Sequence, residues 1–370
     1  MNILFVHLLN NYSGSPQVLA NILKELSLEN YCNIYLLTSK TNGCLSNIAN
    51  IIYLNNHYKW SNNRYVLFFR FLLTQIYIFI FVLFKTRYID IIYINNILSF
   101  SAAIAGKCIH KKIICHIHEL YIHPTIIKRI MWFIMMKSAD TILSVSRYVS
   151  GHINRKSVII YNTVSREFEI TAKNMMGKQD IIDSKFKNKN ILMVSSLKRY
   201  KGIDIFVSIA KKCSDYSFSL VISSMPDEIK KYFVNIQLPK NLKIIPVESD
   251  LTCYYFKASL LVNLSLPDMW VETFGMTLIE GMQFGTPCIA PNFGGPKEII
   301  LHGKNGFLVN PYDEDAIIQA ITIILGSENS YIKFYNNVLR LNNRFSIDTS
   351  KNILKNELDA IYMANRKCDY

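Results

Sequence analysis

Two series of short, uninterrupted apolar segments run along the chain, and each series alternates with helical or loop stretches. The first series begins with MNILFVHLLN at residues 1–10 and continues with CNIYLLTS, IDIIYINN, KKIICHIHE, ADTILSVS and SVIIYN. Strands that are apolar along their whole length are typical of parallel sheets buried on both faces. The alternation with helical stretches predicts a doubly wound α/β domain that closes near Val164.

The pattern restarts at residue 191, where ILMVSSLKRYKGIDIFVSIAKK reads as strand, turn and helix. The segments SFSLVISS, LKIIPV, SLLVNLS, PCIAPN and GFLVN follow as further strands. A chain of 370 residues, 50% of them hydrophobic, is long and apolar enough for two cores. We therefore predict an α/β protein with two Rossmann-like, doubly wound parallel-sheet domains that face each other across a cleft.

The expected boundaries are an N-terminal domain over residues 1–170 and a C-terminal domain over residues 185–346, with the polar residues 165–190 as a linker. Residues 347–370 are expected to form a helix that returns to the first domain. Eight cysteines without a CxxC pair, and a start without a secretory signal pattern, predict a cytoplasmic location.

Positive charge is concentrated in the first half of the chain, which has a net charge of +14 overall. Residues 1–180 contain 19 Lys and Arg against 8 Asp and Glu, and residues 181–370 contain 22 against 19. Such an excess suits nucleic acid, anionic lipid or phosphorylated substrates. Aromatic residues cluster in apolar runs instead of interleaving with the basic ones, which argues against a nucleic-acid partner.

An apolar stretch accompanies this charge, from Arg64 to Arg87, with residues 66–84 almost long enough to span a bilayer. Arg70, Thr74 and Gln75 interrupt it. Three interpretations stay open: a buried or interfacial helix, a core helix without lipid contact, and a spanning helix. A second stretch at residues 126–137 carries Lys128, Arg129 and Lys137 among bulky apolar residues, and either lies on the same lipid surface or is a core helix.

Two carboxylates, Glu272 and Glu280, stand in the nearly uncharged stretch VETFGMTLIEGMQFGTPCIA. We predict a helix that starts at about Gly275 and ends before Gly285, so Glu272 lies in the entering loop and Glu280 on the helix. The first-turn amides of Gly275, Met276 and Thr277 would then form an anion site suited to a diphosphate. Carboxylates beside it would accept hydrogen bonds from hydroxyl groups.

The residues around this pair resemble the nucleotide-sugar signature of retaining glycosyltransferase family 4, which has the glycosyltransferase B fold. The similarity covers Glu272, Phe274, Gly275, Glu280, Gly285, Thr286, Pro287, Gly294, Gly295, Glu298, Asn305 and Gly306. SSLKRYKGID is similar to the family's phosphate loop, in which Lys201 and Gly202 match. Ser196 stands where many members have Arg, and Lys198 or Arg199 is the candidate replacement.

In the first domain, CHIHE resembles the strand end that supplies a donor-sugar contact, with His118 as the matching residue. His116 is expected to face the opposite side of the strand and to be structural. YSGSPQ resembles the family's first loop without its paired glycines, so Gly14 and Ser15 are candidate donor contacts and a plain turn is the alternative.

The resemblance implies a retaining, metal-independent hexosyltransferase that uses a UDP- or GDP-linked sugar and no cofactor. It assigns Lys201 and the helix amides to the diphosphate, Glu280 to the ribose, and Glu272 and His118 to the sugar. The basic, apolar first domain suits a lipid-linked oligosaccharide acceptor at an anionic membrane surface. We expect a peripheral enzyme on the inner face of a bacterial cytoplasmic membrane, in O-antigen, capsule or lipopolysaccharide synthesis.

Other functions stay open at this point. A sugar-nucleotide epimerase or a glycan phosphorylase would use a related two-domain scaffold, and an inactive scaffold or a nucleic-acid-binding protein belongs to other classes. The acidic run Asp313, Glu314 and Asp315 matches a metal-binding pattern of another fold. Its place after Pro311 and before AIIQAI instead predicts acids in the first turn of a helix.

Overall fold

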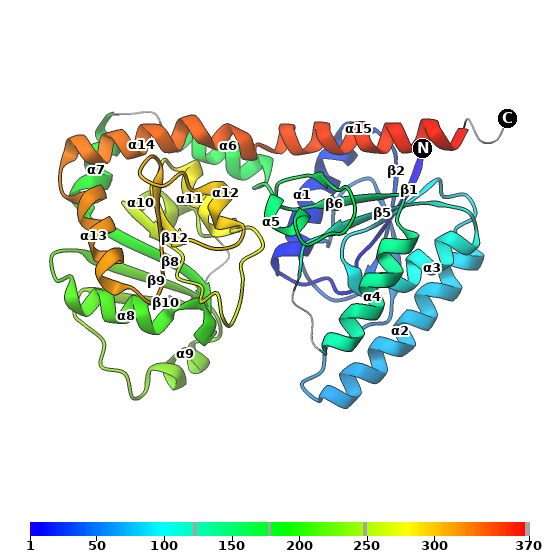
Figure 1. Cartoon of the computed structure of the whole chain (residues 1–370), viewed down its shortest axis with the longest axis horizontal. Coiled ribbons are helices and arrows are strands. Elements are labelled where there is room, and N and C mark those ends of the chain that lie inside the picture. The colour runs from blue at the N-terminus through cyan, green and yellow to red at the C-terminus, as the bar shows by residue number, and fades with distance from the viewer. Residues whose placement is uncertain (121–123, 177–178, 247–249, 367–370) are drawn as a thin grey trace. The chain divides into compact units, whose positions relative to one another are not determined.

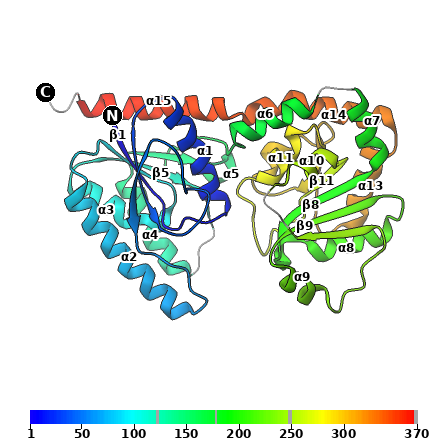
Figure 2. The same ribbon diagram turned by 180° about the vertical axis from the view of Figure 1, so that it is seen from behind.

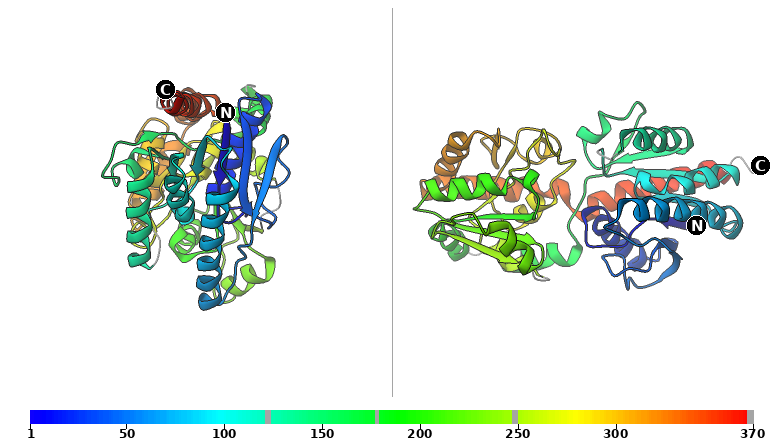
Figure 3. Two further views of the ribbon diagram at one scale, coloured as in Figure 1. Left: turned by 90° about the vertical axis from the view of Figure 1, so that its right-hand side faces the viewer. Right: turned by 90° about the horizontal axis from the view of Figure 1, so that it is seen from below.

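The computed structural model describes residues 1–120, 124–176, 179–246 and 250–366 (Figure 1). The chain forms two compact units. The first consists of Met1–Thr163 with Ile347–Tyr370, and the second of Val164–Ser346. Figures 2 and 3 show helices flanking the sheet within each unit.

The first unit is built on a seven-stranded parallel sheet with the order β3-β2-β1-β4-β5-β6-β7. The order reverses between β1 and β4, as in other doubly wound sheets. The strands are β1 Asn2–Val6, β2 Asn33–Ser39, β3 Ile51–Asn56, β4 Ile91–Ile94, β5 Lys112–Ile117, β6 Thr141–Ser144 and β7 Val158–Ile159. The helices are α1 Gly14–Leu28, α2 Arg64–Lys85, η1 Ile97–Ser99, α3 Phe100–Cys108, α4 Thr125–Ser138, α5 Arg147–Ser150 and α15 Ile347–Arg366.

The six strands predicted for this unit are confirmed, and β3 is an additional one. Ile52 and Tyr53 of this edge strand are exposed. It therefore lacks the continuous burial that marks the central strands, and its sequence IIYLNN ends in two polar residues. A search for fully apolar runs misses an edge strand of this kind.

The second unit is built on a six-stranded parallel sheet with the order β10-β9-β8-β11-β12-β13, which reverses between β8 and β11. Its strands are β8 Asn190–Ser196, β9 Ser217–Ser223, β10 Leu242–Pro246, β11 Leu260–Val262, β12 Cys288–Pro291 and β13 Gly306–Val309. Its helices are α6 Arg166–Met175, α7 Gln179–Asn188, η2 Arg199–Lys201, α8 Ile203–Lys212, α9 Pro226–Phe233, α10 Thr252–Lys257, α11 Met276–Gln283, α12 Pro296–Ile299, α13 Glu314–Leu325, α14 Glu328–Asn342 and η3 Asn343–Phe345. All six predicted strands are present, and Val247, the predicted end of β10, lies outside the described residues.

The prediction of a linker at residues 165–190 is wrong, apart from residues 177–178, which lie outside the described part. Ser165 caps α6 by accepting a hydrogen bond from the Phe168 amide. The Phe168 ring packs edge-on against Tyr255 and Phe284. Most polar residues of α6 and α7 are not buried, and Glu169 and Lys185 are the exceptions among the described residues. The polar composition therefore indicated surface helices and not an unstructured connection.

The helix predicted at the C-terminal end is α15, which packs on α1 of the first unit. Lys351 makes ion pairs with Glu29 at 2.6 Å and Glu25 at 3.5 Å, and Lys355 reaches Glu29 at 2.8 Å. These contacts join residues more than 300 positions apart and complete the first unit.

Helix α2 is long enough and apolar enough to cross a membrane by length and composition, with a mean hydropathy of 2.3 over its best 18-residue window. Only 22% of that window is buried. Its buried residues are Thr74, Gln75, Ile78 and Val82. The interpretation as a core helix is therefore wrong. One narrow face of α2 is buried where the helix packs on α3, and its other side chains are half-buried or exposed. Figure 1 shows α2 at the edge of the first unit.

Candidate functional site

The predicted site residues of the second unit follow strands β8 and β11, the two strands between which the sheet order reverses. Lys201 lies on η2, just after β8, and Glu272 lies on the loop between β11 and α11. In open α/β sheets the carboxyl ends of the strands at this switch point are the usual place for a ligand. The chain therefore brings a cation and a carboxylate together at such a point.

Lys201 and Glu272 form an ion pair in which Lys201 Nζ donates to Glu272 Oε1. Ser265 Oγ donates to the same carboxylate oxygen at 2.9 Å. Both charged side chains are about four-fifths buried, with 20% of Lys201 and 18% of Glu272 exposed. An ammonium group has three donors, so Lys201 can hold Glu272 and still donate to a second anion.

Burial and hydrogen bonding act on the Glu272 carboxyl in opposite directions. Burial by itself would raise its pKa. The charge of Lys201 and the hydrogen bonds from Lys201, Ser265 and Asn263 outweigh burial and hold the pKa of Glu272 below its usual value. Glu272 is consequently an ionised acceptor at neutral pH, which suits the binding of hydroxyl groups.

Two glycine positions allow the backbone to come close at this site. Gly202 has a φ of 75°, and a Cβ there would lie 2.2 Å from the carbonyl oxygen of Leu264. At Gly294, with a φ of 70°, a Cβ would lie 2.4 Å from the carbonyl oxygen of Glu272, and the amide of Gly295 donates to that oxygen at 2.9 Å. Any side chain at these positions would push apart the segments that carry Lys201 and Glu272.

Helix α11 begins and ends where the sequence predicted, with Gly275 as its N-cap. Within the described residues the amides of Gly275, Met276 and Thr277 donate no hydrogen bond. These free donors at a helix N-terminus form an anion site three residues from Glu272. Phe274 is 2% exposed and packs edge-on against Phe345, so its side chain belongs to the core, and its role in donor binding stays a prediction.

Glu280 lies in the second turn of α11 and accepts a hydrogen bond from the hydroxyl of Tyr255. Burial raises the pKa of the Glu280 carboxyl, and the Tyr255 hydrogen bond partly offsets this. Tyr255 is fully buried and stacks with Phe284 at an interplanar angle of 8°. Tyr255 thus fixes the orientation of Glu280, a role that the sequence analysis did not detect, because an aromatic residue in a short apolar helix is normally core.

Lys185 of α7 was also not predicted as a site residue, although it contacts Tyr255, the residue that holds Glu280. Its Nζ donates to the carbonyl oxygens of Phe256 at 2.9 Å and Tyr255 at 3.3 Å, and to Thr286 Oγ1 at 3.0 Å. Burial lowers its pKa to about 7. A single Lys within a polar stretch gives no sequence signal of burial, so only the fold reveals this contact.

The second cation of the predicted phosphate loop has no assigned residue in the structure. Ser196 ends β8, and Lys198 and Arg199 follow it with exposed side chains. Neither makes an ion pair with Glu272, which is held by Lys201. The roles of Lys198 and Arg199 in donor binding stay predictions.

In the first unit, His118 follows β5 and is 5% exposed. Its Nε2 lies 3.1 Å from Asn95 Oδ1, and Asn95 Nδ2 lies 3.2 Å from His7 Nδ1 and 3.0 Å from the carbonyl oxygen of Ser15. Two predicted residues, His118 and Ser15, are therefore joined through Asn95, which the sequence analysis did not single out. Asn95 and His7 follow β4 and β1, the strands at the switch point of this sheet.

The expectation that His116 faces away from His118 is wrong. Residues two apart on a strand lie on the same face, and the two imidazole rings are 4.2 Å apart between centroids. His116 Nδ1 is hydrogen-bonded with the hydroxyl of Tyr93 at 2.7 Å, and its Nε2 is buried without a partner in the described residues. His116 is fully buried, in agreement with a structural role.

Gly14 and Ser15 occupy the first turn of α1. A Cβ on Gly14 would meet no atom within 4 Å, so the fold does not require glycine there. Ser15 Oγ donates to Glu119 Oε1 at 3.4 Å. Burial raises the pKa of the Glu119 carboxyl, and the Ser15 hydroxyl partly offsets this.

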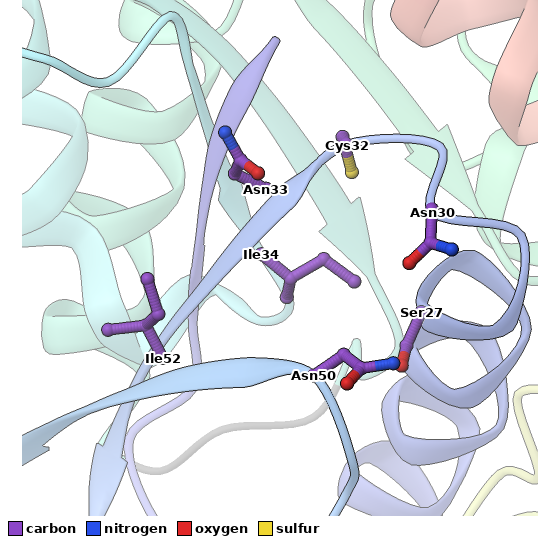
Figure 4. Close-up of a pocket in the computed structure, with 7 residues that line it drawn as sticks. All are labelled: Ser27, Asn30, Cys32, Asn33, Ile34, Asn50 and Ile52. Carbon is purple, nitrogen blue, oxygen red and sulfur yellow. The ribbon is translucent and has the colours of Figure 1, made fainter.

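Two cavities in the described part of the chain differ in place and size. One of about 10 Å³ adjoins Glu272 and is lined by Ser265, Pro267, Trp270, Val271, Glu272, Pro291 and Phe293. The other, of about 250 Å³, lies at the amino ends of β2 and β3 and is lined by Ser27, Asn30, Cys32, Asn33, Ile34, Asn50 and Ile52 (Figure 4). It contains no predicted site residue and lies at the end of the sheet opposite to His118.

The acids at 313–315 have the helix role that the sequence predicted. Asp313 caps α13 by accepting from the Ala316 amide at 2.9 Å. Glu314 pairs with Lys212 at 2.8 Å. Within the described residues no group of three or more His, Cys, Asp and Glu side chains has the arrangement of a metal site.

Comparison with known proteins finds similarity in sequence and in fold. Residues 178–340 match the family model of glycosyl transferases group 1. The chain is 30% identical to sucrose-phosphate synthase 4 of Arabidopsis thaliana over 132 residues, which are 35% of this chain and 12% of that protein. It is 27% identical over 195 residues to an uncharacterized 41.2 kDa protein in the cps region of Klebsiella pneumoniae, covering 50% of this chain and 52% of that protein.

Among solved structures, HepE of Anabaena in complex with UDP superposes with a TM-score of 0.77 at 18% identity, over 97% of this chain and 100% of that chain. The same protein has been solved in complex with UDP-glucose. At this level of identity the likeness establishes the fold. With its two parallel sheets of seven and six strands, the chain has the glycosyltransferase B fold.

Proposed function

We propose that the chain is a retaining, metal-independent hexosyltransferase that uses a nucleotide-sugar donor, because residues 178–340 match the family model of glycosyl transferases group 1. The observation that carries the proposal is the buried Lys201–Glu272 pair beside the free amides that begin α11. One cation, one helix N-terminus and one ionised carboxylate match the diphosphate and the hydroxyl groups of such a donor.

The chemistry follows from these positions. As the bond between sugar and diphosphate breaks, negative charge grows on the leaving diphosphate. Lys201 and the amides of Gly275, Met276 and Thr277 stabilise that charge, and because they are already in place they need no rearrangement when the bond breaks. Glu280, held by Tyr255, accepts hydrogen bonds from the ribose, and Glu272 accepts them from the sugar.

Nucleotide binding tests the proposal directly. UDP, GDP and CMP differ in base and in phosphate number, and one of the two diphosphates is expected to stabilise the protein by about 2.7 kcal/mol at a concentration of about 100 times its Kd. For a domain of this size that raises the Tm by roughly 5 °C. Thermal unfolding monitored by fluorescence measures the shift, and no shift with any of the three would contradict the proposal.

Glu280→Gln is expected to weaken binding of the stabilising nucleotide about tenfold, because a hydrogen bond to a charged acceptor is replaced by one to a neutral amide. Isothermal calorimetry measures the Kd. Glu328→Gln is the matched control, since Glu328 is an exposed acid in the first turn of α14 in the same unit. Equal affinity of the two variants would remove Glu280 from the ribose site.

We further propose that the acceptor is a lipid-linked oligosaccharide and that the first unit docks on an anionic membrane surface. On α2 the exposed apolar side chains form one stripe that includes Phe69, Leu73, Ile76, Ile80 and Phe84. On α4 the exposed apolar residues Ile126, Ile130 and Phe133 recur at helical spacing. Both helices pack on α3.

Every charged side chain on the two helices is cationic. The cations are Arg64, Arg70 and Lys85 on α2 and Lys128, Arg129 and Lys137 on α4. An apolar stripe flanked only by positive charge fits the interface of a bilayer that contains anionic lipid. Ser101 Oγ donates to Gln75 Oε1 of α2 at 2.8 Å, and this contact with α3 supports a helix that lies on the bilayer over one that crosses it.

Replacing Phe69 and Ile76 together with Glu is expected to lower binding to vesicles by at least about 100-fold, because each large apolar side chain contributes about 1.5–3 kcal/mol when it leaves water. Co-sedimentation with vesicles of phosphatidylcholine with and without phosphatidylglycerol measures this. Ile170→Glu with Ile323→Glu, at two exposed positions of the second unit, is the control. If the stripe variant instead converts a dimer into a monomer without altering lipid binding, the face binds a second copy of the chain.

For the pathway, we propose bacterial surface-polysaccharide synthesis, of the O-antigen, capsule or lipopolysaccharide type, on the cytoplasmic side of the membrane. The likeness to a protein of a cps region supports this. Incubation of radiolabelled donor with bacterial membranes distinguishes a transferase from an epimerase, since a transferase labels the lipid extract. A product that appears only as an altered free nucleotide sugar would contradict it.

A further inference from the structure

The carboxyl ends of three neighbouring strands meet around one buried amide in the first unit. His7 follows β1, Asn95 follows β4 and His118 follows β5, and Asn95 is fully buried between the two imidazoles. The first turn of α1 supplies a fourth group, the carbonyl oxygen of Ser15. The group that joins all of them is the side chain of Asn95.

The Ser15 carbonyl determines which way this amide points. A carbonyl oxygen only accepts hydrogen bonds, so the atom of Asn95 that lies 3.0 Å from it must be the NH₂ group. The second hydrogen of that NH₂ points to His7 Nδ1 at 3.2 Å, which is therefore an acceptor. The amide oxygen is left facing His118.

The orientation of the amide in turn determines the tautomer of His118. Asn95 Oδ1 can only accept, so His118 Nε2 at 3.1 Å must carry a hydrogen. In a neutral imidazole the other nitrogen, Nδ1, then has a lone pair. Within the described residues Nδ1 has no hydrogen-bond partner, so its lone pair is free to accept a hydrogen bond.

The surroundings of His118 favour its neutral form. Burial, followed by the neighbouring His116 and His7, holds the pKa of His118 well below its usual value. Burial also lowers the pKa of His7 to about 4 and that of His116 to about 3. Tyr93 and Glu119 are two further titratable groups among the described residues nearby, and burial raises the pKa of both, so Tyr93 is neutral at pH 7 and Glu119 is more readily protonated than usual.

We infer that Asn95 is a positioning residue that holds His118 as the neutral Nε2–H tautomer, so that Nδ1 accepts a hydrogen bond from a hydroxyl group of the substrate. This inference rests on the proposed function for the identity of the substrate, a sugar. It assigns His118 to a sugar hydroxyl and excludes it from contact with the diphosphate, because a bare lone pair repels an anionic oxygen.

The tautomer can be measured without any substrate. Two-bond proton–nitrogen correlation spectra of the full-length protein with ¹⁵N-labelled histidine distinguish the two neutral tautomers and the imidazolium, and the signal lost in His118→Gln assigns His118. The expected result is an Nε2–H pattern that does not change between pH 8 and pH 5.5. An Nδ1–H pattern, or titration near the ordinary pKa of about 6.5, would overturn the inference.

Asn95→Asp tests the role of the amide. A carboxylate cannot donate to Ser15 or His7, and beside His118 it favours the imidazolium. The variant is expected to show a doubly protonated His118 at pH 7 and a kcat/KM lowered about tenfold, the loss of one hydrogen bond to the substrate. Asn96→Asp is the matched control, because it places the same charge at the next residue, a buried amide whose oxygen has no partner in the described residues. This variant is expected to leave the His118 spectrum unchanged.

The outcomes separate this inference from the proposed function. A changed tautomer in Asn95→Asp with undiminished turnover would show that the amide acts on His118 but that His118 does not contact the sugar. An unchanged tautomer would overturn the role of Asn95, whatever the protein binds. If Asn95→Asp does not fold, the wild-type spectrum alone decides the tautomer, and nucleotide binding by the second unit is measured separately.

Discussion

The substitution Lys201→Met is expected to lower the rate of sugar transfer by about 100-fold or more. This is the largest loss of transfer that we expect from any single substitution at the site. Lys201 is the cation that meets the diphosphate as it leaves, and removal of one preorganised donor to a developing charge typically lowers kcat by a factor of about 10²–10³. The measurement is transfer of radiolabel from the stabilising nucleotide sugar into lipid extracted from bacterial membranes.

The same substitution also affects stability, because it leaves the carboxylate of Glu272 without its partner. Removing one member of a buried pair costs about 3–5 kcal/mol, and with nearly a fifth of each side chain exposed we expect about 2 kcal/mol here. Since Lys201 lowers the pKa of Glu272, the variant is expected to protonate Glu272 at a higher pH than the wild type. Urea unfolding at pH 7.5 and pH 5 measures both effects.

The double variant Lys201→Met with Glu272→Gln separates catalysis from folding. No unpaired charge remains in it, so its urea midpoint should return most of the way to the wild-type value, while transfer stays lost. Lys212→Met, which removes an exposed ion pair with Glu314 in the same unit, is the matched control and should retain activity. Recovery of transfer in the double variant would show that Lys201 acts only by holding the loop.

The sequence predicted the parts of the molecule whose causes are local. Mostly apolar runs favour buried parallel strands, and the sequence analysis predicted twelve of the thirteen strands of the described residues from such runs. The two ends of α11 were also predictable from local sequence, since Gly275 and Gly285 flank the helix and both have positive φ values. Glu272, Lys201 and the α11 amides were recognised as a site because each belongs to a short motif.

The unpredicted parts depend on contacts between distant segments. The sequence showed Lys201 and Glu272 as two separate ligand groups, whereas the fold joins them in one ion pair. Lys185 and Asn95 contact segments remote in sequence, and no spacing marks either residue. The error at His116 was of another kind, because strand alternation was applied with the wrong parity to residues two apart.

Lys185 gives the second large prediction, a pH dependence of stability. Its pKa is lowered by burial from 10.5 to about 7 in the folded protein. Between these two values the unfolded chain binds a proton that the folded chain does not, so the free energy of unfolding contributed by this residue rises with pH. Over the window from about pH 7 to pH 10 the rise is on the order of 3–4 kcal/mol, at about 1.4 kcal/mol for each pH unit.

Lys185→Met removes this dependence while keeping the length and the apolar stem of the side chain. The variant also leaves the carbonyl oxygens of Tyr255 and Phe256, at the end of α10, without their shared donor. Its stability relative to the wild type should therefore fall as the pH rises from 7 to 9.5. Urea unfolding midpoints at the two pH values, compared within each pH, give the difference.

Lys212→Met serves as a control with the opposite sign. Hydrogen bonding to Glu314 raises the pKa of Lys212, so its contribution to stability is complete at neutral pH and declines as the pH passes its folded pKa. The difference in stability between wild type and Lys212→Met should consequently stay constant from pH 7 to pH 9.5 and shrink only above the unfolded pKa of 10.5, whereas the difference for Lys185→Met grows from pH 7 to pH 9.5. If the difference in stability between wild type and Lys185→Met stays constant from pH 7 to pH 9.5, the buried ammonium group of Lys185 remains charged. Its hydrogen bonds to the two α10 carbonyl oxygens and to Thr286 would then outweigh the effect of burial on its pKa.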